Sequence, residues 1–315
     1  AYAQAFAEEE GTEPFLFYYE KNGKKAVNVI MRRDIAKDMH FRGKIPEHTY
    51  FDLITPYGYG GFFSENEFPE DFYKVYEAYC REKGYVCEFV RFELFYGYEK
   101  YFEGETECRT HNVVRNLQIS LEDMCMDFEH KVRKNIKKAV RNGLEMMVEE
   151  STDHLEDFLR IYYETMERTG ADRQFYFSEN FFRTISQMKE NMVYFYVLYE
   201  GKIIAAELVL YGAENAYSYL GGTDREYFAL RPNDFLKYEM MKWLKEKGLK
   251  NFVLGGGYGA DDGIFRYKKS FAPNGIADFY IGRKIFDEEL YQRLVEMREE
   301  GDFEKESRFF PLYRS

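Results

Sequence analysis

Cysteine, histidine and long apolar runs are all scarce in this sequence, and each scarcity excludes a class of protein. The 315 residues include four cysteines without a Cys-x-x-Cys pair, which excludes a disulfide scaffold and a recognisable structural zinc site. The five histidines form no His-Glu-x-x-His cluster, so we expect no metal site. The longest apolar runs, such as 203–206, fall far short of the roughly 20 residues that a membrane-spanning helix needs. With no secretory signal ahead of the first predicted strand, the cytoplasm is the simplest expectation for location.

The chain also lacks an excess of positive charge: 44 basic residues stand against 56 acidic ones, for a formal net charge of −12. A broad nucleic-acid-binding surface needs a positive field, so this balance argues against DNA as a partner while leaving room for a local basic site. Aromatic residues, in contrast, are abundant: they make up 19% of the chain, with 29 tyrosines and 30 phenylalanines. Such rings fill cores and cover sheet faces, and a tyrosine-rich pocket also suits a polar organic ligand.

Length and element order predict two α+β domains. At about 150 residues per domain, 315 residues indicate two. Antiparallel strands, a helix, a strand and further strands follow one another twice, at about 15–119 and 144–281, which predicts mixed, largely antiparallel sheets. We expect an N-terminal domain at 1–143, including a basic helix over 121–142, and a second domain at 144–285. A C-terminal helix and tail follow at 286–315, and its acidic helix over 287–300 is expected to be exposed.

Local patterns place the clearest elements. An Asn22-Gly23 turn between two β-type runs predicts a hairpin. Three further runs separated by short turns predict an antiparallel meander, over 193–199, 203–211 and 216–220. A helix is expected to begin at Pro232, with an apolar stripe formed by Leu236, Met240, Trp243 and Leu244.

The first candidate for chemistry is the basic segment 131–141, which carries six basic residues and no acidic one. Val132, Ile136 and Val140 lie four residues apart and are expected to form the buried stripe, which turns the charges outward. Ligand phosphates could then accept charge-assisted hydrogen bonds from Arg133 and Lys137. The alternative is a solvated helix face with no ligand.

Two further candidates lie near the end of the second domain. The glycine-rich loop 255–263 contains Gly256 and Gly257, where a ligand could approach the backbone, although a plain flexible loop fits equally well. The segment 265–271 alternates aromatic and basic residues, which indicates a lysine held against a packed scaffold and able to stabilise an oxyanion. The alternative is a surface basic pair, Lys268 and Lys269.

A fourth candidate is the turn at 168–176. Arg168 and Arg173 flank it, and the planar guanidinium suits a carboxylate or a phosphate. Surface salt bridges to neighbouring acidic residues are the alternative explanation.

Four segments together resemble the FemABX-like branch of the GNAT acyltransferase superfamily, which includes BioF-like acetyltransferase domains. They are 55–61, 138–144, 219–224 with 231–236, and 254–257 with 263–271. The last is the most specific, because it looks like the family's aromatic-lysine signature. The resemblance covers about residues 50–285.

The resemblance implies two tandem GNAT-like domains that move an acyl or aminoacyl group onto an amine, with no tightly bound cofactor. Peptidoglycan-directed members use aminoacyl-tRNA as donor and a muropeptide precursor as acceptor, whereas others use acyl-CoA. Three functions stay open: such a transferase, an acetyl-CoA-dependent N-acetyltransferase acting on a small amine or amino sugar, and a non-catalytic GNAT-like binding module.

The resemblance also implies roles for particular residues. Lys268 matches the lysine that stabilises the transition state, and Arg168 or Arg173, with Tyr176, match substrate-phosphate contacts. We expect Tyr57, Tyr59 and Lys269 to contact substrate, and Gly221, Gly222, Gly256 and Gly257 to contact the donor. The usual GNAT pyrophosphate loop and the helical-hairpin arm of tRNA-dependent relatives are both missing, so the donor stays open. Asp224 and Asp262 are candidates for the base.

Overall fold

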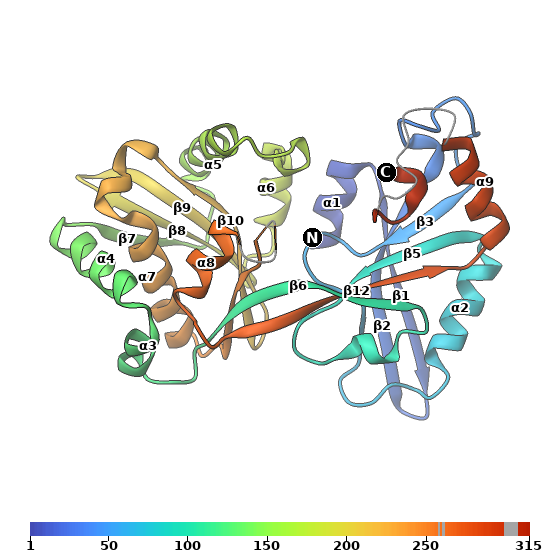
Figure 1. The fold of residues 1–315 in the computed structure, drawn as a ribbon, viewed down its shortest axis with the longest axis horizontal. Coiled ribbons are helices and arrows are strands. Elements are labelled where there is room, and N and C mark those ends of the chain that lie inside the picture. The colour runs from blue at the N-terminus through green and yellow to red at the C-terminus, as the bar shows by residue number, and fades with distance from the viewer. Residues whose placement is uncertain (258, 260–261, 299–307) are drawn as a thin grey trace. The chain divides into compact units, whose positions relative to one another are not determined.

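The computed structural model describes residues 1–257, 259, 262–298 and 308–315, which contacts divide into two compact units (Figure 1). Residues 110–277 form one, the central unit, and residues 2–109 with 278–315 form the other, the split unit. This division differs from the predicted boundaries at 143 and 285. The reason is packing: the basic helix contacts the helix over 232–246, and the C-terminal helix contacts the strand over 85–91.

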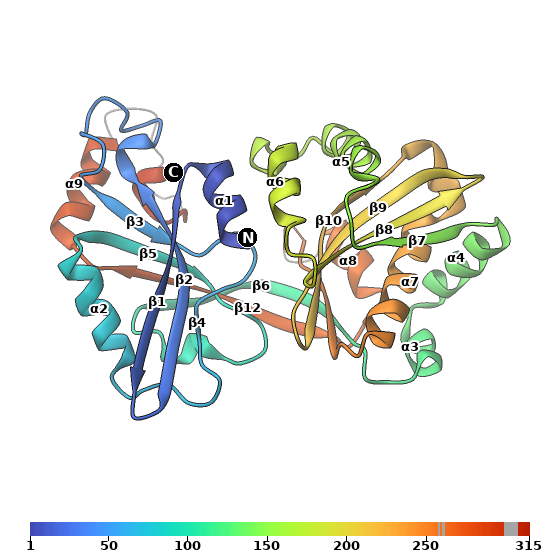
Figure 2. The same cartoon turned by 180° about the vertical axis from the view of Figure 1, so that it is seen from behind.

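The central unit is built on a mixed sheet. Its strand order is β6 (Glu105–Asn116), β11 (Asn251–Gly255), β10 (Asn215–Thr223), β9 (Lys202–Tyr211), β8 (Met192–Tyr199) and β7 (Glu145–Glu149). Strands β10 and β11 are parallel, and the other neighbours are antiparallel. The predicted meander of three strands is therefore confirmed (Figure 2).

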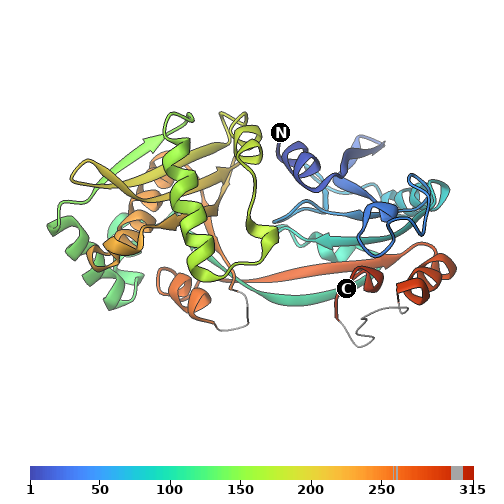
Figure 3. The same cartoon turned by 90° about the horizontal axis from the view of Figure 1, so that it is seen from above.

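Helices cover both faces of this sheet. They are α3 (Leu121–Asp127), α4 (His130–Arg141), α5 (Leu155–Thr169), α6 (Glu179–Ile185), α7 (Pro232–Glu246) and α8 (Gly263–Lys269). Because side chains alternate along a strand, Phe195 of β8 contacts Trp243 of α7, whereas Tyr194 contacts Phe158 of α5 on the other face. Figure 3 shows α5 lying along its face of the sheet.

The basic helix α4 packs differently from the prediction at one position. Val132 and Ile136 are buried as expected, but Val140 is 56% exposed. Ala139 is buried in its place, and α4 packs on α7. A small residue at this point lets the two helices approach closely, so the stripe turns toward Ala139.

In the split unit the strands pair in the order β1 (Glu13–Lys21), β2 (Lys24–Asp34), β3 (Phe51–Ile54), β5 (Tyr85–Arg91) and β12 (Ile276–Ile285), with β4 (Phe62–Phe63) paired to β2. The β1–β2 hairpin confirms the Asn-Gly turn prediction. Strands β3 and β5 are parallel, and β6 and β12 each run from one unit into the other. Both units thus have the predicted α+β architecture.

Three helices complete the split unit: α1 (Tyr2–Glu10), α2 (Phe72–Glu82) and α9 (Glu288–Arg298). The prediction that the last helix is exposed is wrong for one side, because Tyr291, Leu294 and Val295 are buried against a second core. Residues 299 and 300 of that predicted helix lie outside the described residues. Among the described residues, no helix combines the length and apolar character needed to cross a membrane.

Candidate active site

A cavity opens in the central unit where β10 and β11 separate. The two strands pair in parallel over Asn215–Tyr217 and Asn251–Val253, and β10 then continues beside β9. The cavity has a volume of about 310 Å³ and is lined by the second half of β10 and by residues of α5, β9, α7 and α8. We call it the lysine cavity, and its polar lining includes Arg168, Glu207, Ser218, Lys237, Tyr267 and Lys268.

Two glycines of β10 shape the wall of this cavity. A Cβ at Gly222 would overlap with the Thr165 hydroxyl and the Ile161 carbonyl oxygen of α5, and one at Gly221 would lie 2.5 Å from the Ala206 carbonyl oxygen of β9. Only glycine fits where backbones approach this closely. The close packing of β10 between β9 and α5 therefore explains both glycines without a ligand.

Lys268 enters the lysine cavity from the short helix α8. Asp262 caps this helix by accepting a hydrogen bond from the Phe265 backbone N–H at 2.7 Å, and the buried Phe265 ring anchors it. The Nζ of Lys268 then donates to the carbonyl oxygen of Gly256, just after β11, at 2.6 Å. The amine is therefore held at the point where β11 has left β10.

The environment of Lys268 disfavours its positive charge. Burial, together with the nearby Lys237 ammonium, lowers the pKa of Lys268 to about 8, although Glu207 and Asp262 act in the opposite direction. Among the described residues, no carboxylate lies within ion-pair distance of its Nζ. A lysine with such a shifted pKa in a cavity is a functional candidate.

The neighbouring Lys237 is paired, in contrast. Its Nζ donates to Glu207 Oε1 and to Ser218 Oγ, and Ser218 donates to the same carboxylate. The hydroxyl of Tyr267, beside Lys268, is buried and has no hydrogen-bond partner in the described part of the chain. Burial raises the pKa of Tyr267 well above its usual value, so this hydroxyl stays neutral.

A second cavity, of about 730 Å³, lies at the start of α7, and we call it the basic cavity. Four cations line it against two carboxylates: Lys131, Arg231, Arg266 and Lys269 against Glu129 and Asp234. The N-terminus of the 15-residue helix α7 adds partial positive charge. Asn233 and Tyr267 line both cavities, so a ligand with phosphate groups could extend from one to the other.

The central unit also matches a known protein family, described as an acetyltransferase (GNAT) domain, over residues 127–269. These residues are a GNAT domain. Both cavities are lined mainly by its residues.

Relatives extend the likeness beyond the GNAT domain. UDP-N-acetylmuramoylpentapeptide-lysine N(6)-alanyltransferase of Weissella viridescens is 28% identical over 176 residues, which cover 53% of this chain and 50% of that protein. The chain thus matches about half the length of this curated relative. The crystal structure of FemX has a TM-score of 0.69 at 13% identity and 92% coverage of both chains. The structure of L-PGS from Bacillus licheniformis has a TM-score of 0.53 at 14% identity and 94% coverage of both.

These comparisons confirm two predictions. The resemblance to the FemABX-like branch of the GNAT superfamily holds, since both the GNAT domain and an alanyltransferase relative match. The fold is the predicted tandem GNAT-like one, because the FemX likeness covers nearly the whole chain.

The GNAT domain brings several of the predicted site residues together. Arg168, Gly221 and Gly222 line the lysine cavity with Lys268, and Gly256 accepts the Lys268 hydrogen bond. Lys269, the next residue, lines the basic cavity. The other predicted donor contact in the loop, Gly257, lies against the Asp262 carboxylate, and residues 258, 260 and 261 of this loop lie outside the described residues.

Other predicted residues of the GNAT domain line neither cavity. Arg133 donates to the carbonyl oxygens of Met126 at 2.6 Å and Phe128 at 2.8 Å, where it closes the end of α3. Lys137 is exposed on α4, and Arg173 and Tyr176 are exposed in the turn after α5. Their ligand contacts stay predictions.

The two predicted tyrosines lie in the split unit. Tyr57 is 38% exposed and its carbonyl oxygen accepts a hydrogen bond from the Tyr2 hydroxyl, while the Tyr59 ring meets Phe279 edge-on.

Both candidate bases act as helix caps. The Asp224 carboxylate accepts a hydrogen bond from the Glu226 backbone N–H, and Asp262 caps α8.

Sequence reasoning missed Glu207 and Lys237. Glu207 is the single charged residue of the apolar strand 203–211, and a charged residue is almost never fully buried unless it is paired, so it indicated a buried partner. Lys237 lies on α7 among other charged residues, such as Asp234 and Glu239, so its sequence context carried no such signal. The sequence did not identify Lys237, 30 residues away, as the partner of Glu207.

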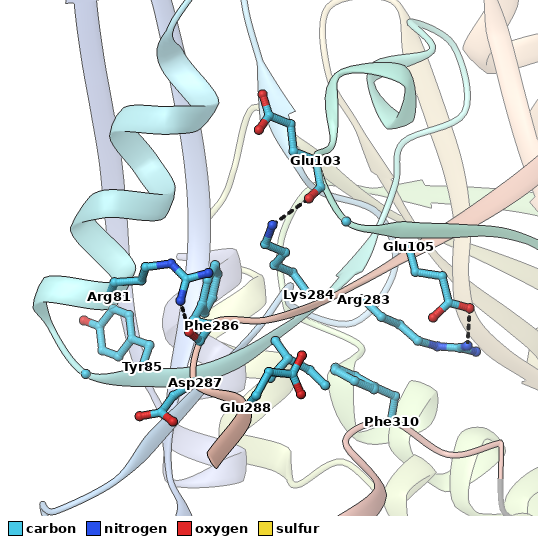
Figure 4. Close-up of a pocket in the computed structure, with 13 residues that line it drawn as sticks. Arg81, Tyr85, Glu103, Glu105, Arg283, Lys284, Phe286, Asp287, Glu288 and Phe310 are labelled. Carbon is cyan, nitrogen blue, oxygen red and sulfur yellow. Dashed lines mark hydrogen bonds and ion pairs between the residues drawn. The ribbon is translucent and has the colours of Figure 1, made fainter. Parts of the chain in front are cut away.

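Figure 4 shows a third cavity, of about 800 Å³, in the split unit. Its cations have partners within that unit. Arg81 donates to the Phe286 carbonyl oxygen, Arg283 pairs with Glu105, and Lys284 donates to the Glu103 carbonyl oxygen at 2.7 Å. Because these cations already have hydrogen-bond or ion-pair partners in the protein, the lysine cavity is the stronger candidate for chemistry.

One group in the split unit could bring metal-ligand atoms together, namely Asp34, Glu47 and His48. The Asp34 carboxylate already accepts hydrogen bonds from the Ala36 and His48 backbone N–H groups. These contacts fix the loop, so they explain the cluster without an ion.

Proposed function

We propose that this chain transfers an aminoacyl or acyl group from an activated, phosphate-bearing donor onto an amine, with Lys268 at the reacting centre. The observation that carries the proposal is the desolvated Lys268 amine in the gap between β10 and β11. The basic cavity beside it supports a donor that carries phosphate groups.

Such a transfer makes three demands on the protein. The acceptor amine must be held against the donor carbonyl, a proton must leave it, and the tetrahedral oxyanion needs a positive or hydrogen-bonding partner. Lys268 in its charged form meets the third demand. The neutral Tyr267 hydroxyl can offer a hydrogen bond from the same helix, because it has no partner among the described residues.

The name of the alanyltransferase relative supports an aminoacyl group as the cargo and a UDP-N-acetylmuramoyl-pentapeptide as the acceptor, attacked through a lysine N6 amine. Aminoacyl-tRNA is the donor that fits such a cargo, and acyl-CoA is the alternative because it also carries phosphates. Arg168 lines the lysine cavity, which supports a contact between its guanidinium and an anionic part of a ligand. Arg173, Tyr176, Tyr57 and Tyr59 remain proposed acceptor contacts.

A transfer assay tests this proposal. Total tRNA charged with amino acids and, in parallel, acetyl-CoA are incubated with the protein and the muropeptide precursor. We expect the acceptor mass to rise by one amino-acid residue with charged tRNA and to stay unchanged with acetyl-CoA. Acetylation of the acceptor or of a small amine instead would establish the CoA-dependent alternative. Binding of both donors with no transfer to any amine would favour a non-catalytic module.

A further inference from the structure

The lysine cavity contains two lysines in opposite electrostatic situations. Lys237 and Glu207 are both more than nine-tenths buried and form an ion pair. The Lys237 Nζ also donates a hydrogen bond to the Ser218 Oγ at 2.7 Å. Lys268 has the Gly256 carbonyl oxygen as its partner. A carboxylate stabilises an ammonium far more than a neutral carbonyl does, so Lys268 is the lysine that gives up its proton more easily.

The charged groups around Lys268 come from four elements. Lys237 of α7 and Arg168 of α5 are cations, while Glu207 of β9 and Asp262, which caps α8, are anions. Glu207 is already engaged by Lys237 and Ser218. The Glu207 carboxylate is therefore paired with Lys237 and not with Lys268.

We propose that Lys268 enters the reaction as a neutral amine and itself takes the proton of the acceptor ammonium, and that the Lys237–Glu207 pair is the positioning element that keeps it neutral. This inference rests on the proposed function and supplies the base that Asp224 and Asp262, both used as caps, do not provide. The lowered pKa of Lys268, about 8, agrees with it.

Each proton and each bond in the proposed reaction can be followed in turn. The Lys268 lone pair binds one proton of the acceptor ammonium, which leaves the acceptor neutral and Lys268 positive. The acceptor nitrogen then attacks the donor carbonyl carbon, and the new ammonium of Lys268 stabilises the oxyanion. Collapse breaks the bond to the leaving oxygen or sulfur, which takes the second proton of the attacking nitrogen, and Lys268 finally releases its proton to water.

Competitive labelling of amines tests the charge state without any donor or acceptor. The whole protein is treated with trace acetic anhydride between pH 6 and 11, and the labelled peptides are quantified by mass spectrometry. We expect Lys268 to react with a midpoint near pH 8, about two units below the value near 10.4 that is typical of exposed lysines. A midpoint in the ordinary lysine range would overturn the inference.

Two variants separate charge from packing. Lys237→Met removes the repelling ammonium and leaves Glu207 unpaired, so the Lys268 midpoint should rise by a unit or more. The double variant Lys237→Met/Glu207→Gln loses the same packing but no net charge, so its midpoint should return toward wild type. Equal midpoints in the two variants would contradict the positioning role. Lys242→Met, in the same helix and paired with Glu239, is the matched control and should leave the midpoint unchanged.

The same variants are followed in the transfer assay. The acid limb of the kcat/KM profile should follow the Lys268 midpoint and move to higher pH in Lys237→Met. Thermal unfolding shows which variants fold. If Lys237→Met does not fold, the Lys268 midpoints of wild type and of the double variant still test the inference. A shifted Lys268 without any transfer would overturn the proposed function and with it the proton-transfer step, whereas transfer with an unshifted Lys268 would overturn this inference alone.

Discussion

The Lys268 Nζ lies 2.6 Å from the carbonyl oxygen of Gly256, so a single hydrogen bond joins the end of α8 to the end of β11. This contact fixes the amine where β11 and β10 separate. The position of the amine is thus set by this hydrogen bond, whereas burial and the Lys237 ammonium lower its pKa.

Replacing Lys268 should abolish most of the transferase activity. We expect Lys268→Ala to lower kcat by a factor of about 100 to 1000, which corresponds to about 2.7–4 kcal/mol of lost oxyanion stabilisation. Lys268→Arg should not restore activity, because a guanidinium cannot lose its proton in a protein. The rate of acceptor modification measures both effects, with Lys242→Ala as the control. Full activity in Lys268→Ala would contradict the assignment.

Much of the fold could be predicted because its signals are local. The hairpin follows from Asn22-Gly23, the meander from alternating runs, and α7 from Pro232 and an apolar stripe. The grouping of elements into units could not be predicted, since it depends on the packing of α4 against α7. The exposure of Val140 depends on that packing as well.

The candidate site divides in the same way. Lys268 could be singled out from an aromatic-basic segment, because that pattern is continuous in the sequence. The Lys237–Glu207 pair could not, because it joins residues from a helix and a strand. The expected donor contact at Gly222 has a packing explanation that becomes visible only when α5 is placed against β10.

Charge in the basic cavity should affect donor binding more than turnover. We expect Lys269→Gln or Arg231→Gln to raise the donor KM several-fold with little change in kcat, since each removes a phosphate partner. Their KM values should also depend less on salt than that of wild type. Lys137→Gln tests the exposed face of α4, which the sequence also predicts to bind phosphate. A larger KM effect there than at Lys269 would place the donor on that face.

The backbone approach at Gly222 should not tolerate a side chain. We expect Gly222→Ala to lower the free energy of unfolding by about 1–3 kcal/mol, because the new Cβ overlaps with Thr165 and with the Ile161 carbonyl oxygen. Urea denaturation measures the loss. Gly212→Ala is the matched control, since nothing lies within 4 Å of its Cβ position and its φ is not positive. Similar stabilities of the two variants would show that β10 can move away from α5.

Glu88 in the split unit should make stability depend on pH. Its carboxyl is buried and accepts a hydrogen bond from the Tyr76 hydroxyl at 2.7 Å, while Oε2 has no partner among the described residues. Burial raises the pKa of Glu88 to about 7, against about 4.3 in an unfolded chain, and the Tyr76 hydrogen bond opposes this only in part. The folded state therefore binds more protons than the unfolded state between these pH values, so stability falls as pH rises from about 4.3 to about 7.

Glu88→Gln removes this titration while keeping the shape of the side chain. We expect the free energy of unfolding of the variant, minus that of wild type, to increase from pH 5 to pH 8 by about 3 kcal/mol at most. Urea denaturation at the two pH values measures the change, with Glu82→Gln on the exposed side of α2 as the control. Because the amide can still accept from Tyr76, a constant difference between variant and wild type at both pH values would show that Glu88 is already ionised in the fold at pH 5.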